Sequence, residues 1–94
     1  MKINAIDING NLKQYDTLLT YHSDEFNKDY VVYTDNLYNS NNELQIYISE
    51  YNPDNLELTV KNISNIDEYN LIKDKINTIL LTVKKETDKL DSNE

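Results

Sequence analysis

The sequence predicts an α+β fold: a mainly antiparallel five-stranded β-meander sheet with one C-terminal amphipathic helix packed on one face. Three observations support this fold class. Segments before residue 62 alternate apolar and polar residues with a period of two, which is typical of half-buried strands. Asparagine, aspartate, glycine and proline separate these segments, as turns require. From Tyr69 onward, apolar residues recur every three or four positions, which indicates one face of a helix.

The first two strands are expected at residues 3–8 and 12–21, joined by Asn9-Gly10. This dipeptide favours a type I′ turn, in which both central residues have positive φ. On the second strand, strict alternation predicts that four residues share one face: Tyr15, Thr17, Leu19 and Tyr21. An acidic loop is expected to follow at residues 22–28.

The middle of the chain predicts three more strands. The third, at residues 29–34, is followed by an asparagine-rich loop over 35–43. The fourth, at residues 44–51, places its aliphatic and aromatic residues on opposite faces: Leu44, Ile46 and Ile48 on one, Tyr47 and Tyr51 on the other. After an Asn-Pro-Asp-Asn turn, residues 56–61 alternate again and predict the fifth strand.

The C-terminal helix is expected to carry an apolar stripe made of Tyr69, Ile72, Ile76, Ile79, Leu80 and Val83. Ser64 or Asn65 is expected to cap its N-terminus, because an acidic residue follows three positions later. We expect the helix to cover the aliphatic face of the sheet, so that residues 1–85 form a single small α+β domain. Residues 86–94 are predicted to form a polar, frayed tail.

The composition limits the classes of partner. The 94 residues carry a formal net charge of −8, with nine lysines, no arginine and no cysteine. Proteins that bind nucleic acids or anionic membranes depend on clustered Lys and Arg, so neither kind of binding is expected here. The sequence contains no long apolar stretch and no signal-peptide pattern, which predicts a cytoplasmic protein. A protein partner with a basic surface fits this charge best.

No motif in the sequence predicts an enzyme, a cofactor site, a metal site or a small-molecule substrate. The only histidine, His22, stands beside a serine and an aspartate, but neighbouring residues of an extended segment point in different directions and form no triad. Asp7, Asn9 and Asn11 match the start of a calcium loop, yet leucines occupy its glycine and glutamate positions. We therefore expect a non-catalytic protein. A hydrolase built on His22 is the enzymatic alternative, and it requires a pocket with His22 at its floor.

Four segments of the chain resemble one protein family. They are a hairpin ending in LLTY, the stretch SDEFNKDYVVYTD, the alternating LQIYISEY and the helical NIDEYNLIKDKINTIL. Their order, over roughly residues 3–82, resembles the YrzB-like family of small acidic bacterial proteins, carried as a domain of unknown function. Asn27 stands where a glycine is common in that pattern, and Tyr69 where a tryptophan is common. The resemblance implies the fold above and no activity.

The candidate interaction surface is a patch on the sheet face opposite the helix, made of Val31, Tyr33, Tyr47 and Tyr51. Tyrosine is enriched at interfaces, so the patch predicts a protein-interaction or regulatory module that docks a partner, or a second copy of the chain, through its open sheet face. The patch also has a structural interpretation, because cross-strand tyrosine pairs stabilise half-exposed sheets. The alternative function is an acidic nucleic-acid mimic that occupies the basic groove of a nucleic-acid enzyme.

Overall fold

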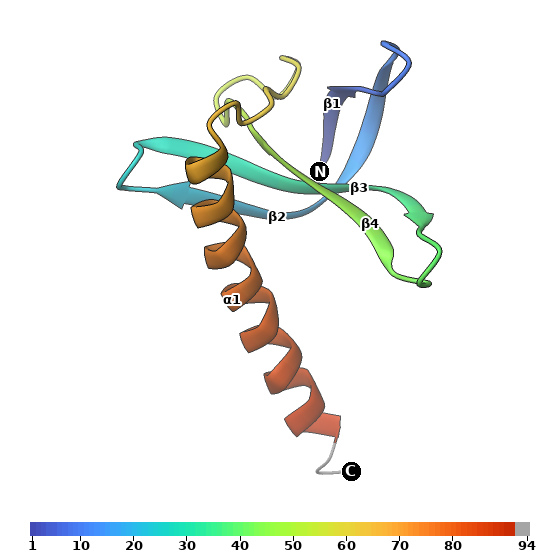
Figure 1. Ribbon diagram of the computed structural model, residues 1–94, viewed down its shortest axis with the longest axis vertical. Helices are drawn as coiled ribbons and strands as arrows, with labels where there is room; N and C mark the ends of the chain where they lie inside the picture. The colour runs from blue at the N-terminus through green and yellow to red at the C-terminus, as the bar shows by residue number, and fades with distance from the viewer. Residues whose placement is uncertain (92–94) are drawn as a thin grey trace. The chain divides into compact units, whose positions relative to one another are not determined.

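The computed structural model of the chain describes residues 1–91, which belong to two compact units (Figure 1). The first unit, residues 1–63, contains the described strands. The second unit, from Ser64 on, contains the described helix. The predicted single domain over residues 1–85, with the helix packed on the sheet, stays a prediction.

The first unit is an antiparallel sheet with the strand order β1-β2-β3-β4. The strands are β1 (Lys2–Ile6), β2 (Leu12–Ser23), β3 (Lys28–Tyr38) and β4 (Leu44–Glu50). Each strand pairs with the next along the chain, so the antiparallel meander and the α+β class are confirmed. The predicted number of strands is wrong, because the described residues contain four strands and not five.

Residues 56–61, the predicted fifth strand, form turns followed by two isolated bridges. Local hydrogen bonds explain the difference. Asn55 Oδ1 accepts the amide of Glu57 over 3.2 Å, and the Asn55 carbonyl accepts the amide of Leu58 over 3.3 Å. Asparagine side chains that bind the backbone in this way compete with strand pairing. Both leucines of the segment are therefore exposed and do not lie on a buried face.

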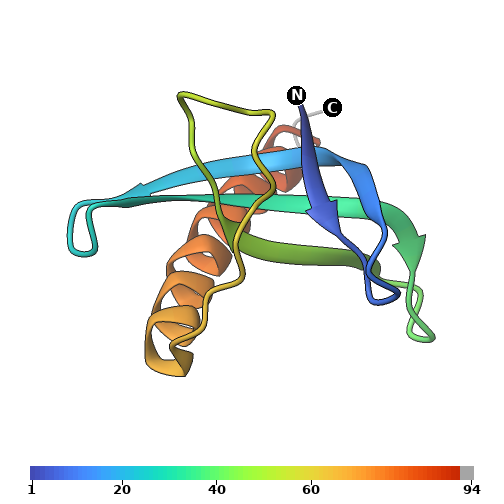
Figure 2. The same ribbon diagram turned by 90° about the horizontal axis from the view of Figure 1, so that it is seen from above.

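The two bridges of this segment connect the outer strands of the sheet. Thr59 pairs with Asn4 of β1, where the amide of Val60 donates to the Asn4 carbonyl over 2.9 Å. Lys61 then exchanges two backbone hydrogen bonds of 2.8 Å with Glu50, the last residue of β4. Because one short segment touches both outer strands, the sheet is rolled at this end, and the chain after β4 loops over it (Figure 2).

Two hairpin turns share one geometry. In the β1–β2 turn the amide of Gly10 donates to the Asp7 carbonyl, and Asp7 Oδ1 accepts the amide of Asn9. Gly10 has a φ of 82°, but Asn9 is not among the residues with positive φ, so the predicted type I′ turn is wrong. The β3–β4 turn repeats the arrangement with Asn39 as acceptor and Asn42, at φ 62°, in the glycine position. Each loop thus has three residues and ends in one left-handed residue.

Strand β2 contains a bulge that reverses the faces on which its residues lie. The register with β3 shifts between Thr17 and Leu19, where β2 has one extra residue. An extra residue on one strand interrupts the alternation of side chains. Tyr15 and Thr17 therefore lie on one face, and Leu19 and Tyr21 lie on the other. The prediction that these four residues share a face is wrong for this reason.

The core of the first unit lies on the face that carries Val31 and Tyr33. These residues form a buried cluster with Ile3 and Ala5 of β1. Three partly buried side chains pack against the cluster: Tyr15, Tyr51 and Val60. Residues of β1 and of the segment that links the outer strands therefore fill this face. Val31 and Tyr33 lie in the core and not on an open surface.

The second unit contains helix α1 (Ile66–Asp91). Asn65 caps it, because its Oδ1 accepts the amide of Glu68 over 3.0 Å and its carbonyl accepts the amide of Tyr69. Asn65, one of the two predicted caps, is thereby confirmed. The predicted frayed tail over 86–94 stays a prediction: α1 extends as far as Asp91, and residues 92–94 lie outside the described residues. No helix of the described chain has both the length and the apolar character needed to cross a membrane.

Candidate functional site

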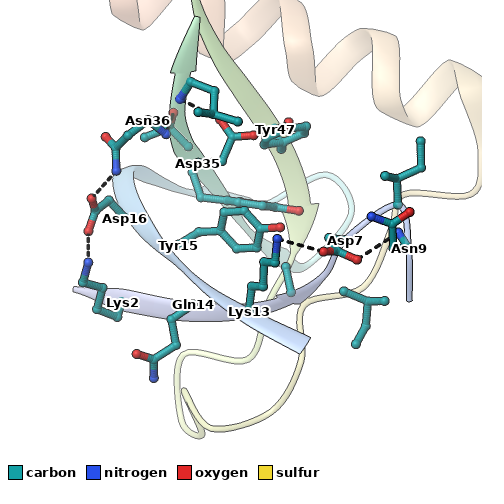
Figure 3. A pocket seen from close by; sticks show the side chains of 16 residues that line it. Lys2, Asp7, Asn9, Lys13, Gln14, Tyr15, Asp16, Asp35, Asn36 and Tyr47 are labelled. Atoms are coloured by element: carbon teal, nitrogen blue, oxygen red, sulfur yellow. Dashed lines mark hydrogen bonds and ion pairs between the residues drawn. The ribbon is translucent and has the colours of Figure 1, made fainter. Parts of the chain in front are cut away.

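The first unit contains a cavity of about 570 Å³ between the β1–β2 hairpin and the end of β3 (Figure 3). Its walls come from the β1–β2 hairpin, from residues 33–37 of β3 and from Tyr47 of β4. Volumes of this order are typical of sites that take a small molecule or a side chain. Figure 3 shows Tyr15 and Lys13 next to each other on one wall, with Asp7 beyond the lysine.

Three tyrosine rings form one wall of this cavity. Tyr33 and Tyr47 are stacked, with ring centroids 5.5 Å apart and an interplanar angle of 30°. Tyr15 packs against both, at 5.4 Å from Tyr33 and 6.3 Å from Tyr47. The rings meet because Tyr33 is paired with Tyr47 across β3 and β4, and because the bulge in β2 places Tyr15 on the same face. Aromatic pairs of this kind each contribute about 0.5–1.5 kcal/mol beyond the burial of their surface.

Hydrogen bonds hold two of the three rings. The hydroxyls of Tyr33 and Ser49 lie 2.9 Å apart in the buried interior, and burial raises the pKa of Tyr33. Tyr47 donates its hydroxyl to Asp35 Oδ2 over 2.8 Å. That bond, with a smaller effect of burial, raises the pKa of Tyr47 to about 12. Both phenols therefore stay neutral well above physiological pH.

An irregular segment at the end of β3 positions Asp35. The register with β4 shifts after Thr34, and Asn36 has a left-handed φ of 64°. The Thr34 hydroxyl donates to a carbonyl of β4 over 2.6 Å and accepts the amide of Asn36. Asp35 Oδ1 accepts the amide of Leu37 over 3.0 Å. These bonds fix the backbone on both sides of Asp35, and bulges commonly direct a side chain into a site in this way.

The charged residues of the cavity form two ion pairs and leave one carboxylate. Lys13 Nζ lies 3.0 Å from Asp7 Oδ2, and Lys2 pairs with Asp16. A backbone amide of the turn and then Lys13 lower the pKa of Asp7, and Asp7 raises the pKa of Lys13. Lys2 is the main cause that lowers the pKa of Asp16. Asp35 forms no ion pair with any residue that the structure describes.

The four residues of the predicted patch share a sheet face but occupy different places. Val31 is fully buried in the core, and Tyr33 is buried where it lines the cavity. Tyr47 also lines the cavity, and 39% of it is exposed. Tyr51 lines a separate cavity of about 560 Å³ formed with residues of the segment after β4. The structure thus brings Tyr33 and Tyr47 together and separates them from Tyr51.

Two cavity residues, Tyr15 and Asp35, are missing from the predicted patch. Tyr15 is missed because no residue type between Thr17 and Leu19 signals a bulge, and strict alternation then assigns it to the opposite face. Asp35 is missed because residues 35–43 have the composition of a loop. The sequence could nevertheless have predicted the face on which Asp35 lies, because continuing the alternation of Val31 and Tyr33 by one step places Asp35 on the same face.

His22 lies between two carboxylates at the end of β2. His22 Nδ1 lies 2.9 Å from Asp29 Oδ1, and Nε2 lies 3.4 Å from Asp24 Oδ1. The buried Ser23 hydroxyl accepts the amide of Phe26 over 3.2 Å, so it stabilises the turn between β2 and β3. His22 is half exposed and lines neither of the two cavities described above. The His22 hydrolase requires His22 at the floor of a pocket, and neither of these two cavities provides that.

The calcium-loop-like sequence serves the β1–β2 turn. Asp7 Oδ1 accepts two backbone amides, those of Asn9 and Asn11, both over 2.9 Å, while Oδ2 binds Lys13. A carboxylate with these partners has little capacity left for a cation. Among the side chains that the structure describes, no group of three or more His, Asp or Glu is arranged to hold a metal ion.

Comparison with known proteins identifies relatives in several bacteria. The chain is 34% identical over 83 residues to a UPF0473 protein of Leuconostoc mesenteroides, and the match covers 84% of each protein. The chain belongs to the UPF0473 family. A UPF0473 protein of Bacillus pumilus is 32% identical over 81 residues, which cover 84% of this chain and 85% of the relative. A UPF0473 protein of Lactobacillus acidophilus is 29% identical over 83 residues, which cover 84% and 81%. No protein-family model and no solved structure matches the chain.

The UPF0473 name states no activity, substrate or partner. It confirms the prediction of an uncharacterised bacterial family. The more specific YrzB-like resemblance stays a prediction, because the relatives carry a different family name. The expectation of a non-catalytic protein also stays a prediction.

Proposed function

We propose that this UPF0473 protein is a non-catalytic interaction module that binds a partner protein through the tyrosine cavity, the site formed by Tyr15, Tyr33, Tyr47 and Asp35. The observation that carries the proposal is the three-ring wall, which reaches the surface at Tyr47. Tyrosines that combine a large apolar ring with a polar hydroxyl are enriched where proteins bind each other. We place this interaction in the cytoplasm, as the sequence predicts.

The charge of the chain supports a partner with a basic surface. The formal net charge is −8, which attracts a positively charged protein over long range. The cavity has the same sign, because its two lysines are paired with Asp7 and Asp16 while Asp35 is not paired. This arrangement favours a basic protein over a nucleic acid or an anionic membrane.

Affinity capture with two matched tyrosine variants tests the proposal. The full chain, Tyr47→Ala and Tyr38→Ala are immobilised and exposed to lysate of the bacterium that makes the protein. Tyr38 is 64% exposed and does not line the cavity, so it controls for the loss of a surface ring. We expect a partner that binds the wild type and Tyr38→Ala but not Tyr47→Ala, with the affinity then measured by calorimetry on purified proteins. Equal binding by all three chains would contradict the proposal.

The acidic nucleic-acid mimic is the second candidate. A mimic presents rows of unpaired carboxylates in place of phosphates, whereas lysines neutralise Asp7 and Asp16 beside the cavity. This pairing favours the interaction module. The same captured partner distinguishes the two functions: a mimic competes with double-stranded DNA or RNA for it, and its binding weakens steeply with salt. Such competition, combined with normal binding by Tyr47→Ala, would replace the proposed function by mimicry.

A further inference from the structure

From the geometry of the tyrosine cavity we infer that it binds an arginine side chain of the partner protein, an inference that rests on the proposed function. The guanidinium group forms two hydrogen bonds with the Asp35 carboxylate and lies against the ring of Tyr47. Three properties of the described residues support this ligand: the free acceptor positions of Asp35, the partial exposure of Tyr47 and the balance of charge in the cavity.

Asp35 supplies the acceptors that a guanidinium needs. Its Oδ1 accepts the amide of Leu37 over 3.0 Å, and its Oδ2 accepts the hydroxyl of Tyr47 over 2.8 Å. An ionised carboxylate has about four lone-pair positions, so each oxygen keeps one acceptor position free. The two oxygens then match the two parallel N–H groups of a planar guanidinium, which binds carboxylates in this bidentate way.

Tyr47 supplies the aromatic surface. One face of its ring is stacked on Tyr33, and Tyr15 packs against the ring at an interplanar angle of 62°, but 39% of the residue is still exposed, so part of the ring is available to a ligand. Guanidinium groups stack on tyrosine faces, where the ring quadrupole attracts the positive charge. The hydrogen bond between Tyr47 and Asp35 keeps the ring and the carboxylate side by side, so that one planar cation can contact both.

The charges in and around the cavity select one cation, supplied by another protein. Lys13 is paired with Asp7 and Lys2 with Asp16, so the charged side chains that line the cavity carry one net negative charge, although Lys13 also attracts Asp35 electrostatically. A lysine of a partner could satisfy this charge, but its compact ammonium has no planar fork and stacks less well on a ring. The chain contains no arginine, so a second copy of itself cannot supply the guanidinium.

A titration with a single amino-acid derivative tests the ligand directly. N-acetyl-arginine amide is added to the isotope-labelled full chain while two-dimensional amide NMR spectra are recorded. We expect saturable shifts at Leu37 and Tyr47, whose groups bind Asp35. N-acetyl-citrulline amide has nearly the same shape but a neutral urea group, and it should give no saturable shift there. Equal responses to both compounds, or no response at these amides, would overturn the inference.

Two aspartate variants identify the carboxylate. Asp35→Asn should weaken binding of the arginine derivative about tenfold, as expected when a charge-assisted hydrogen-bond pair loses its charge. Asp54→Asn makes the same change of net charge at an exposed residue in the turns after β4, and it should bind like the wild type. Equal effects of the two substitutions, or normal binding by Asp35→Asn, would count against the inference.

Two further variants apply if Asp35→Asn does not fold. Tyr47→Phe keeps the ring but loses the bond to Asp35, so it should bind more weakly than the wild type, whereas Tyr47→Ala also removes the ring and should bind severalfold more weakly than Tyr47→Phe. Equal affinities of these two variants would contradict the proposed stacking.

The two levels of proposal can fail separately. If partner capture depends on Tyr47 but the arginine derivative does not bind, the inference is wrong and the proposed function stands. If capture does not depend on Tyr47, the proposed function is wrong. The titration is a separate experiment, and it still shows whether the cavity itself binds the arginine derivative.

Discussion

The buried hydrogen bond between Tyr33 and Ser49 makes a quantitative test of the cavity wall possible. The two hydroxyl oxygens lie 2.9 Å apart, with Tyr33 6% and Ser49 1% exposed. Water therefore cannot replace either partner when the other is removed. Tyr33→Phe leaves the Ser49 hydroxyl without this partner, and Ser49→Ala leaves the Tyr33 hydroxyl without it. Each substitution removes a single oxygen, so neither opens a cavity of significant size.

The expected energies follow from the cost of a buried polar group without a partner. Each single substitution should lower the free energy of unfolding by about 1–3 kcal/mol, because one hydroxyl remains buried and unpaired. The double variant removes both hydroxyls and should be close to the wild type in stability. The two effects should therefore be strongly non-additive. For a domain of this size, about 1 kcal/mol corresponds to a shift of roughly 4–8 °C in Tm.

Urea unfolding followed by circular dichroism provides the measurement. The wild type, the two single variants and the double variant form a complete thermodynamic cycle. An additive result, in which the double variant loses the sum of the two single losses, would refute the buried bond. Single variants as stable as the wild type would likewise show that water reaches the pair.

Three further measurements test other features of the structure. Ultraviolet titration should show that Tyr47 has a pKa of about 12, and this pKa should return toward the ordinary value near 10 in Asp35→Asn. A titration curve that is the same in the wild type and Asp35→Asn would contradict the Tyr47–Asp35 bond. Because folding raises this pKa, its contribution to stability is complete below about pH 10 and is lost as the pH rises through about 12. Val31 is 0% exposed, so Val31→Ala should lower the free energy of unfolding by roughly 2 kcal/mol in urea unfolding. Ile8 is 100% exposed, so Ile8→Ala should change it by less than about 0.5 kcal/mol. Equal effects of the two substitutions would refute the burial of Val31. Asn42 has a φ of 62°, so Asn42→Ala should cost about 1–2 kcal/mol while Asn42→Gly is tolerated, and equal melting temperatures would argue against the left-handed residue.

The confirmed predictions depend on residues that are close together in the sequence. The helix is found because its apolar period and its Asn65 cap act within one or two turns. The four strands are found because alternation and the turns between them are local signals. The β1–β2 turn was predicted at the correct place but with the wrong type. The dipeptide Asn9-Gly10 does not indicate that the amide of Asn9 donates a hydrogen bond to the Asp7 carboxylate.

The incorrect predictions depend on competition between local and long-range hydrogen bonds. Residues 56–61 alternate like a strand, but Asn55 binds the backbone of its neighbours and only Thr59 and Lys61 reach the sheet. The face of Val31 was expected to be open because alternation shows which residues share a face but not what covers it. Its cover comes from β1 and from the segment after β4, which are distant in sequence from Val31.

The tyrosine cavity exists because both strands beside it interrupt their alternation. Without the extra residue between Thr17 and Leu19, Tyr15 would lie on the opposite face, and the three-ring wall would lose one ring. The second interruption follows Thr34, where the left-handed Asn36 allows the bonds that fix the backbone around Asp35. Natural sequences depart from their local rules mainly at functional or strained sites. Two such departures beside one cavity therefore favour a binding role for its tyrosines over a role in stability alone.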